Sequence, residues 1–330
     1  MKTAIVILNW NGKALLEQFL PSVVQHSHGA EIWVADNAST DGSVAIVRAQ
    51  FPEIKIVENP SNMGYAGGYN HALKSIDAEI YVLVNSDIEV TQNWLPPVLS
   101  VFENEPDVAI VQPKIRDFKR REYFEYAGAA GSFIDRFGYP FCRGRVFDTI
   151  EKDNGQYDDD CDIFWASGAC FFIRKSVFDS LEGFDAGFFA HQEEIDLCWR
   201  AFNAGYVSRY VAASTVYHVG GATLNEGSPR KTELNFRNSL SMLVKNLPSG
   251  KLPFIIFARL CLDGIAGIRF LSKGKVMHCL AIIKAHFGFY NLLRINYRKR
   301  SETQKSGYFK LKNLISAYFI SGKKKFSDLF

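Results

Sequence analysis

The chain has 330 residues, of which 47% are hydrophobic and 22% are charged, and this composition excludes a predominantly disordered protein. No run of 18 uncharged apolar residues occurs, so we expect no conventional transmembrane helix. The apolar run that follows Met1 is too short for a signal peptide. Six cysteines form no C-x-x-C pair, which indicates the reduced thiols of a cytoplasmic protein.

The small net charge of +3 hides two parts of opposite sign. Residues 1–225 carry 18 Lys and Arg against 30 Asp and Glu, a net charge of −12, whereas residues 226–330 carry 20 against 5, a net charge of +15. A basic region of this size is typical of contact with an anionic surface, either phospholipid or nucleic acid. Since no base-reading motif accompanies the charge, we expect membrane contact and no nucleic acid.

In the first 115 residues, short β-branched runs alternate with helical patterns. The expected strands are Thr3–Leu8, Glu31–Ala35, Ile54–Val57, Ile80–Val84 and Val108–Val111. The expected helices lie between them, at Lys13–Val24, Ser43–Ala49, Tyr65–Ser75 and Trp94–Phe102. This alternation predicts an α/β fold with a Rossmann-like, mainly parallel sheet that helices flank on both faces.

Residues 116–225 show a mixed pattern, with a helix expected from about residue 192 to residue 204 and ended by Gly205. After residue 226 the chain is predicted to be wholly helical, with two apolar stretches that single charged residues interrupt. Apolar faces combined with Lys and Arg are typical of helices that lie in a membrane interface. A helical bundle that packs on the rest of the chain is the alternative. Residues 226–330 are therefore predicted to form a basic amphipathic helical extension.

Three of the expected strands are followed by clusters of polar or small residues. The clusters are 36–43 (Asp-Asn-Ala-Ser-Thr-Asp-Gly-Ser), 62–70 (Asn-Met-Gly-Tyr-Ala-Gly-Gly-Tyr-Asn) and 85–87 (Asn-Ser-Asp). Each alone could be a turn, but ligands of parallel sheets bind at the carboxyl ends of the strands, so three clusters predict a pocket. Dinucleotide and Walker-type sites are excluded, because Asn9-Trp10-Asn11-Gly12 follows the first strand in place of GxGxxG and no GxxxxGK[ST] occurs.

The segment 6–11 (Val-Ile-Leu-Asn-Trp-Asn), together with 36–43 and 62–68, resembles the family-2 glycosyltransferases of the GT-A fold. The resemblance covers roughly residues 1–225 and is strongest to the bacterial rhamnosyltransferase-like branch that builds surface polysaccharides. It implies a nucleotide-sugar-binding half at 1–115 and an acceptor-binding half of the same domain at 116–225. The residues that it places at the donor are Asn9, Asp36, Asp41, Asn62, Gly64, Gly67, Asn85 and Ser86.

The segment Asn85-Ser86-Asp87 matches the D-x-D motif of this family, with asparagine in place of the first acid. The resemblance implies that Asp87 binds a divalent cation, Mg²⁺ or Mn²⁺, between the two donor phosphates. Such a cation stabilises the negative charge that grows on the departing nucleoside diphosphate. His218 lies where relatives often place a histidine near the metal, and a plain strand residue is the alternative. Gly220-Gly221 suggests a loop that closes over the phosphates.

Residues 188–200 resemble the family's aromatic-x-E-D-x-D-L-C segment at the start of a helix, with Glu194 in place of the family's aspartate. The resemblance implies that Glu194 is the general base that takes the proton from the acceptor hydroxyl, and that Glu193 and Asp196 share or orient this role. An acidic first turn that only complements the helix dipole is the alternative. Trp165 and Ser167 are the expected acceptor contacts, with plain packing as the alternative for Trp165.

These features favour an inverting glycosyltransferase of hexosyl- or rhamnosyltransferase type that acts on a saccharide or a lipid-linked saccharide at the inner face of the cell membrane. Two other functions remain open. A sugar-nucleotide nucleotidyltransferase would carry a Gly- and Lys-rich phosphate loop after its first strand, which this chain lacks. A non-catalytic nucleotide-sugar-binding module would keep the fold without the activity.

Overall fold

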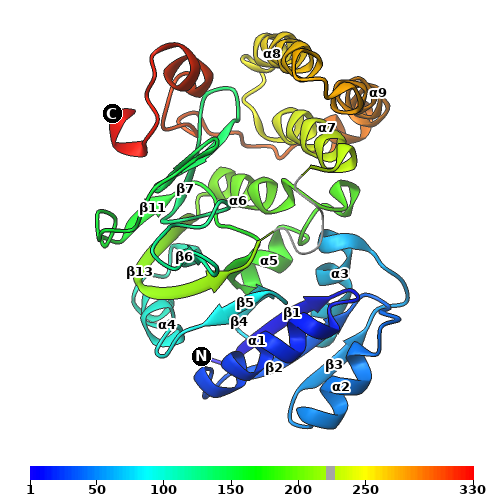
Figure 1. Cartoon of the computed structure of the whole chain (residues 1–330), viewed down its shortest axis with the longest axis vertical. Coiled ribbons are helices and arrows are strands. Elements are labelled where there is room, and N and C mark those ends of the chain that lie inside the picture. Colours follow the sequence, from blue (N-terminus) through cyan, green and yellow to red (C-terminus); the bar gives the residue numbers. More distant parts are fainter. Residues whose placement is uncertain (221–226) are drawn as a thin grey trace.

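The computed structural model describes residues 1–220 and 227–330 (Figure 1). Its main sheet contains β1 (Thr3–Asn9), β2 (Glu31–Asp36), β3 (Lys55–Glu58), β4 (Ile80–Asn85), β5 (Ile88–Val90), β6 (Val108–Asp117), β11 (Cys161–Ile163), β12 (Cys170–Arg174) and β13 (Val207–His218). The strand order is β11-β13-β6-β12-β4-β1-β2-β3, and β5 pairs with β13. The β1 strand is parallel to β2 and β4, and β2 is parallel to β3, whereas β12 is antiparallel to its neighbours β4 and β6. The prediction of a mixed, mainly parallel sheet is confirmed.

Helices cover both faces of this sheet. They are α1 (Lys13–His26), α2 (Ser43–Gln50), α3 (Gly64–Ala72), α4 (Leu95–Asn104), α5 (Lys175–Ser180) and α6 (Glu193–Ala204). Successive side chains of a strand point to opposite faces, so Ile5 and Ile7 pack in one core with side chains of α1, α2 and α4. Ala4 and Val6 pack in the second core with side chains of α3 and α6.

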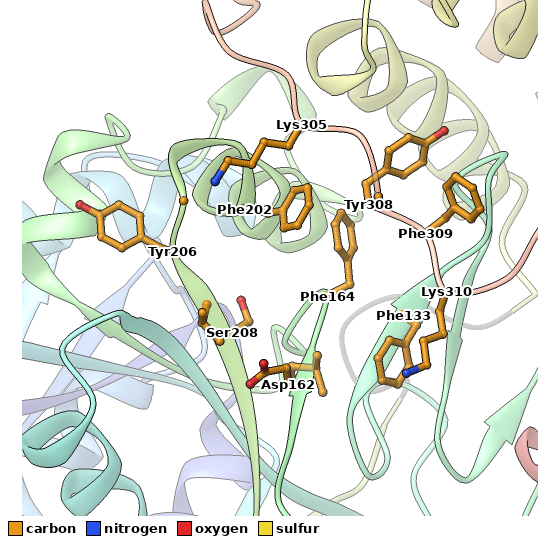
Figure 2. A pocket seen from close by; sticks show the side chains of 14 residues that line it. Phe133, Asp162, Phe164, Phe202, Tyr206, Ser208, Lys305, Tyr308, Phe309 and Lys310 are labelled. Atoms are coloured by element: carbon orange, nitrogen blue, oxygen red, sulfur yellow. The ribbon is translucent and has the colours of Figure 1, made fainter.

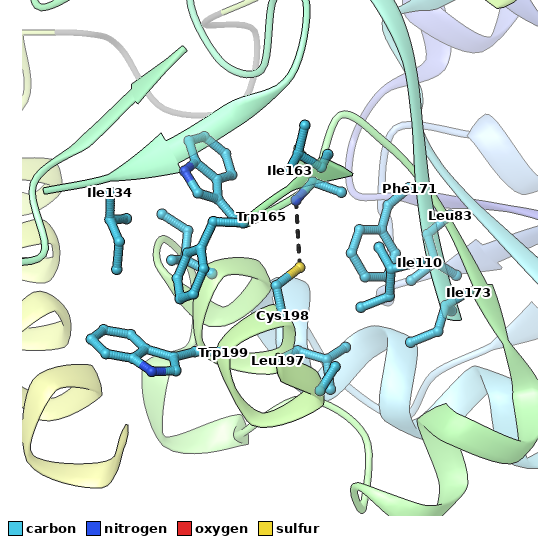
Figure 3. Packing of buried hydrophobic residues seen from close by; sticks show 14 of the residues in the cluster. Leu83, Ile110, Ile134, Ile163, Trp165, Phe171, Ile173, Leu197, Cys198 and Trp199 are labelled. Atoms are coloured by element: carbon cyan, nitrogen blue, oxygen red, sulfur yellow. Dashed lines mark hydrogen bonds between the residues drawn. The ribbon is translucent and has the colours of Figure 1, made fainter. Parts of the chain in front are cut away.

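A small antiparallel sheet completes the second core. It contains β7 (Ser132–Ile134), β8 (Pro140–Cys142), β9 (Arg145–Val146) and β10 (Thr149–Ile150). The α6 helix turns Leu197, Cys198 and Trp199 inward against this core, and the backbone N–H of Ala166 donates a hydrogen bond to Cys198 Sγ at 3.4 Å (Figure 3). This packing fixes α6 relative to the main sheet.

Three long helices form a layer at one end of the molecule (Figure 1): α7 (Pro229–Asn246), α8 (Leu252–Ser272) and α9 (Val276–Arg298). The α7 helix packs against α6 as well as against α8 and α9. Beyond Arg298 the chain is not the continuous helix that the sequence pattern predicts. It runs across the small sheet, where Lys310 N donates to Ile134 O at 3.0 Å. The ring centroids of Phe326 and Phe133 lie 5.7 Å apart. Aromatic contacts with the small sheet, and not the spacing of apolar residues along a helix, determine the conformation of this segment.

One helix among the described residues, α9, is long and apolar enough to cross a membrane by length and composition. It has 23 residues, and its most apolar window has a mean hydropathy of 1.3. The expectation of no conventional transmembrane helix rests on the lack of an uncharged run of this length, and the α9 window contains Lys284. Only 22% of that window is buried.

Candidate functional site

Asn9, at the end of β1, joins this strand to the first polar loop. The two N–H groups of its Nδ2 are shared among three acceptors, Asp36 Oδ1 at 2.9 Å, Ser39 Oγ at 3.1 Å and Ser43 Oγ at 3.0 Å. Asp36 Oδ2 accepts from the backbone N–H of Ser39 at 2.8 Å. Asn9 Oδ1 is buried and has no hydrogen-bond partner among the described residues. A buried acceptor without a partner is costly, which indicates that water or a ligand donates to it.

Asp41 holds the same loop to the start of α1. Its carboxylate accepts from the backbone N–H of Lys13 at 2.8 Å and from the backbone N–H of Ser43 at 3.0 Å, and the Ser43 hydroxyl donates to it as well. Burial raises the pKa of Asp41, but these hydrogen bonds outweigh burial and leave the pKa below its usual range. Asp41 is therefore ionised at neutral pH, and its recorded hydrogen bonds shape the loop.

A network of asparagines shapes the second polar loop. Asn37 Nδ2 donates to Gly64 O at 2.9 Å, and Asn59 Nδ2 donates to Asn37 Oδ1 at 2.7 Å. Asn62 Oδ1 accepts from Gly64 N at 3.0 Å and so defines the start of α3. A Cβ on Gly68 would lie only 2.7 Å from the Asn37 amide. The backbone at Gly68 therefore approaches Asn37 too closely for any larger residue.

The start of α3 lies directly against the turn that precedes α6. The backbone N–H groups of Tyr65 and Ala66 donate to Phe189 O at 2.8 and 3.4 Å. Gly64 has a φ of +69°, and a Cβ there would lie 2.4 Å from Phe189 O. Only glycine combines this left-handed backbone with so close an approach. Two segments that are more than 120 residues apart in sequence therefore meet at the same edge of the sheet.

The other predicted donor residues lie along the same edge. A Cβ on Gly67 would lie 3.0 Å from the Cβ of Met63, the residue just before α3, so the first turn of α3 is tightly packed. Asn85 N donates to Ala169 O at 3.0 Å at the end of β4. Ser86 Oγ would lie 3.5 Å from a Cβ on Gly12, which places Ser86 beside the loop that follows β1.

The pairing of β13 with β5 brings His218 to Asp87, because His218 lies opposite Ile88 in the antiparallel register. His218 Nε2 is 3.1 Å from Asp87 Oδ1, and His218 Nδ1 is 3.2 Å from Glu125 Oε1. Burial lowers the pKa of His218, but the two carboxylates outweigh it and raise the pKa to about 10. Burial likewise raises the pKa of Asp87, and the contact with His218 holds it below its usual range.

Asp87 and His218 together fit a divalent cation. They offer a hard carboxylate oxygen and an imidazole nitrogen, which are common metal ligands, and the two atoms already converge within 3.1 Å. A cation would displace the proton that His218 holds between its two carboxylates, because only neutral imidazole coordinates a metal. In residues 1–220 and 227–330, no group of three or more His, Cys, Asp or Glu side chains forms a complete metal site. Water or phosphate oxygens would complete the coordination.

The first two residues of α6 are the glutamates Glu193 and Glu194. Glu193 is 4% exposed, and the Oε2 atoms of both Glu193 and Glu194 are buried without a hydrogen-bond partner among the described residues. Burial raises the pKa of Glu194 to about 7, although backbone N–H groups at the helix start oppose the shift. Burial and the charge of Glu194 raise the pKa of Glu193 well above its usual value. A carboxylate whose pKa lies near neutral pH is suited to accept a proton.

Asp196, which the sequence suggests as a third catalytic acid, is fully engaged in the interior. Its Oδ2 accepts from Lys245 Nζ at 2.7 Å and from Arg200 Nε at 2.9 Å, and its Oδ1 accepts from Asn246 Nδ2 at 2.8 Å. Lys245 also contacts Asp185 at 2.8 Å. Burial raises the pKa of Asp196, but the two cations outweigh it and lower the pKa. We therefore assign Asp196 an anchoring role between α6 and α7 in place of a catalytic one.

Tyr65 connects the carboxylates of α6 to the edge that carries Asp87. Its hydroxyl donates to Gly168 O at 2.8 Å. The adjacent carbonyl, Ala169 O, accepts from the backbone N–H of Asn85, two residues before Asp87. Burial raises the pKa of Tyr65 strongly, and the charge of nearby Glu194 adds to the shift. The polar loops of β1, β2 and β4 and the carboxylates of α6 thus belong to one continuous region.

The two predicted acceptor contacts lie inside the protein. Trp165 is 3% exposed, and its Nε1 donates to Phe133 O at 3.0 Å within the core (Figure 3). Ser167 is 1% exposed, and its backbone N–H donates to Gln112 Oε1 at 2.8 Å. For Trp165 the burial agrees with the alternative of plain packing, and packing covers the Ser167 side chain as well. Acceptor contact through either residue stays a prediction.

A cavity of about 340 Å³ lies elsewhere, between the end of α6, β13 and the chain around residues 305–310 (Figure 2). Its wall is mainly aromatic, with Phe164, Phe202 and Tyr308. None of the residues predicted from sequence lines this cavity. The volume of this cavity is therefore no guide to the region that holds the polar loops and the carboxylates of α6.

Sequence reasoning missed three residues that support the site. Glu125 contacts His218 from an irregular segment after β6 and belongs to no motif. Lys245 and Asn238 lie on α7, which the charge pattern assigns to a separate extension. A lysine within the apolar run 240–247 is the one sequence signal that could have indicated a buried cation.

Comparisons with known proteins identify the family of the chain. The family described as Glycosyl transferase family 2 matches residues 4–182. The chain is 26% identical over 231 residues to the N-acetylglucosaminyl-diphospho-decaprenol L-rhamnosyltransferase of Mycobacterium tuberculosis, which covers 65% of this chain and 75% of that protein. It is 23% identical over 203 residues to the low-salt glycan biosynthesis hexosyltransferase Agl10 of Haloferax volcanii, with 60% and 61% covered.

Solved structures of glycosyltransferases share the fold. The mannosyltransferase PcManGT from Pyrobaculum calidifontis, in complex with GDP-Man and Mn²⁺, aligns with a TM-score of 0.54 and 16% identity over 88% of this chain and 87% of that chain. GalNAc-T7 with UDP, GalNAc and Mn²⁺ aligns with a TM-score of 0.60 and 15% identity over 76% of this chain and 49% of that chain. The predicted GT-A fold is therefore confirmed.

Replacing Gly64 with alanine is expected to separate α3 from the turn at Phe189. A left-handed backbone costs alanine about 1–2 kcal/mol, and the new Cβ would also overlap Phe189 O. Gly42→Ala is the matched control, since Gly42 has a φ of +83° but no atom within 4 Å of its Cβ position. Urea unfolding should show a loss of stability for Gly64→Ala that exceeds the loss for Gly42→Ala by about 1–3 kcal/mol. Equal losses would contradict the close contact.

Proposed function

Because the chain belongs to glycosyl transferase family 2, we propose that it transfers a sugar from a nucleotide-diphosphate donor to a hydroxyl of a lipid-linked saccharide, with inversion. The hydrogen bond from Tyr65 N to Phe189 O carries the proposal, because it joins the glycine-rich segment 62–68 to the turn that leads into the carboxylates of α6. The name of the mycobacterial relative, which describes a lipid-linked acceptor, supports this acceptor class. Synthesis of surface polysaccharide at the inner face of the cell membrane is the corresponding role.

The donor lies across the polar loops in this proposal. Asp36 contacts the base, for which its carboxylate retains free acceptor positions beside Asn9 and Ser39. The unpartnered Asn9 Oδ1 accepts a hydrogen bond from the same end of the nucleotide. The small residues of the segment 62–68 let the backbone approach the phosphates. Asn85 contacts the ribose, as the first residue of the family motif does.

Glu194 acts as the base in a single displacement. Its carboxylate takes the proton from the acceptor hydroxyl while the hydroxyl oxygen bonds to the anomeric carbon, on the face opposite the phosphate. The bond from that carbon to the diphosphate oxygen breaks, and its electron pair leaves with the nucleoside diphosphate. Burial and the charge of Glu194 raise the pKa of Glu193, so the pair resists carrying two negative charges.

Asp87 and His218 would hold a divalent cation, which neutralises charge on the departing diphosphate when bound. The donor phosphates would supply the remaining oxygen ligands, as is usual for Mg²⁺ and Mn²⁺ sites with few protein carboxylates. Glu125 keeps the His218 ring in place from the other side, at 3.2 Å from Nδ1.

Glu194→Gln is expected to lower turnover by about 10²–10⁴, because the variant keeps the shape of the side chain but cannot accept the proton. The measurement is release of nucleoside diphosphate from donor and acceptor, with nucleotide affinity followed separately and expected to stay within a few-fold. In the parent protein kcat/KM should fall below a pH of about 7, as Glu194 gains a proton.

The control for this prediction is Glu193→Gln, the same change at the neighbouring carboxylate, which is not the proposed base and should lose much less activity. Turnover of Glu194→Gln equal to that of the parent would remove Glu194 as the base. Release of pyrophosphate in place of nucleoside diphosphate would instead identify a nucleotidyltransferase.

Mn²⁺ is expected to strengthen the stabilisation of the protein by nucleoside diphosphates, because Asp87 and His218 bind it jointly with the phosphates. A ligand at a hundredfold excess over its Kd adds about 2.7 kcal/mol of stability, so Tm should rise by several degrees. Asp87→Asn should abolish the Mn²⁺-dependent part of this rise in a thermal-shift assay. Asp179→Asn, at an exposed ion pair on α5, should leave it intact. A rise of the same size in both variants would contradict the proposed cation site.

The α8 and α9 helices are proposed to bind an anionic membrane. Their outer faces expose large apolar side chains that the rest of the protein leaves uncovered; the most exposed are Phe254, Phe257, Ile265, Ile268, Met277 and Phe287, each at 62–68%. Exposed cations accompany them, among them Arg269, Lys273, Lys275, Lys284 and Arg294. An apolar face bordered by Lys and Arg fits the boundary between lipid headgroups and chains.

The double variant Phe257→Ser/Phe287→Ser is expected to bind vesicles of anionic phospholipid at least about tenfold more weakly. Burying one phenylalanine side chain contributes about 1.5–3 kcal/mol, and 1.4 kcal/mol corresponds to a factor of ten. Sedimentation with vesicles gives the affinity, and Tyr126→Ser, an exposed aromatic on the small-sheet side, is the control. Binding that is unchanged in the double variant, or insensitive to salt in the parent, would contradict the proposed surface.

A further inference from the structure

The turn that leads into α6 is strained. Phe189, His191 and Gln192 have φ values of 63°, 71° and 74°, so three non-glycine residues within four positions adopt a left-handed backbone. Each such residue costs about 1–3 kcal/mol and persists only where the surroundings hold it in place. Strained backbone of this kind gathers at active sites. Glu193 follows the last of these residues directly, and Glu194 comes next.

Hydrogen bonds from two helices hold this turn through its carbonyl groups. The start of α3 binds Phe189 O, as described above. On the other side, the two N–H groups of Asn238 Nδ2 in α7 are shared among three carbonyl oxygens, Phe188 O at 3.0 Å, Ala190 O at 2.9 Å and His191 O at 2.8 Å. Every carbonyl oxygen from residue 187 to residue 191 therefore accepts a hydrogen bond from α3 or α7.

Arg237 fixes the orientation of the Asn238 amide. Its Nε donates to Asn238 Oδ1 at 2.9 Å, and its Nη2 donates to Gly187 O at 3.1 Å and to Phe188 O at 3.2 Å. With Oδ1 held in this way, the amide N–H groups can only point toward the turn. Asn238 is completely buried. Gly288 of α9 provides the space for Arg237, since a Cβ there would lie 3.1 Å from Arg237 Cδ.

We propose that Asn238, oriented by Arg237, is a positioning residue that holds the turn 188–192 in the strained shape that aims Glu194 at the acceptor hydroxyl. The inference rests on the proposed function, because Glu194 is the base there. It assigns part of the reaction geometry to α7, which lies outside the segment matched by the family. A displacement of about 1 Å in a reacting group can cost about 10² in rate, so loosening this turn should slow the chemical step while donor binding persists.

The test compares Asn238→Ala with Asn235→Ala, which removes an amide of the same helix whose hydrogen bond goes to Lys231 O, one turn earlier in α7. Hydrogen exchange followed by mass spectrometry reports on the peptide that spans 188–194 without any need for activity. Exchange there should be faster in Asn238→Ala and unchanged in Asn235→Ala. In transfer assays, kcat of Asn238→Ala should fall about 10–10²-fold, with donor KM within about twofold. The acidic limb of the pH profile should move to lower pH, because water that reaches Glu194 favours its charged form and lowers its pKa.

Two further variants keep the inference testable if Asn238→Ala folds poorly. Asn238→Asp has nearly the same shape but no N–H to donate, so it should be as impaired as the alanine variant. Arg237→Lys keeps the charge and loses the Nε contact, and its kcat should fall about tenfold. Parent-like kcat and pH profile in folded variants whose turn exchanges faster would overturn the positioning role and leave the proposed function intact. Unchanged exchange in all three variants would overturn it too. A parent protein that transfers no sugar would instead remove the proposed function.

Discussion

The hydrogen bonds on Phe189 O determine where the parts of this protein meet. The backbone at the start of α3 can reach this carbonyl only because Gly64 lacks a side chain, and the same carbonyl belongs to the turn that leads into α6. The contact therefore sets the separation between the polar loops and the carboxylates of the helix. A displacement of either segment would move both sets of functional groups relative to each other, which explains why glycine and strained residues concentrate here.

Two buried acids that are two residues apart have pKa values shifted in opposite directions. Glu194 has no cation among its recorded partners, so burial raises its pKa to about 7. Asp196 is completely buried, but Lys245 and Arg200 neutralise it and lower its pKa. One helix thus presents an acid that can exchange a proton near neutral pH and another that remains a fixed anion. Environments that separate the pKa values of neighbouring acids are typical of acid–base sites.

The sequence predicted the strands and helices of the first 115 residues well, because β-branched runs and helical periodicity coincide with burial on both faces of the sheet. It also located the polar loops, because strand ends determine where they lie. It could not place Glu125 or Asn238, whose roles depend on contacts between segments far apart in the chain. The two alternatives for Trp165 have the same origin, since sequence alone does not say whether its side chain faces the core or a ligand, and the contact with Phe133 depends on a segment 32 residues away. Helical periodicity also failed beyond residue 298, where contacts with the small sheet determine the conformation.

The lysine shared by two acids bears on how the polypeptide can be divided. Composition places a boundary near residue 226, where the charge changes sign. Yet Lys245 lies beyond this boundary and supplies the positive charge for Asp185 and Asp196, and Lys299 adds a second contact to Asp185 at 2.7 Å. A fragment that ended at the boundary would retain buried anions whose main counter-charges had been removed. The change in charge along the chain is therefore no border between autonomous folding units.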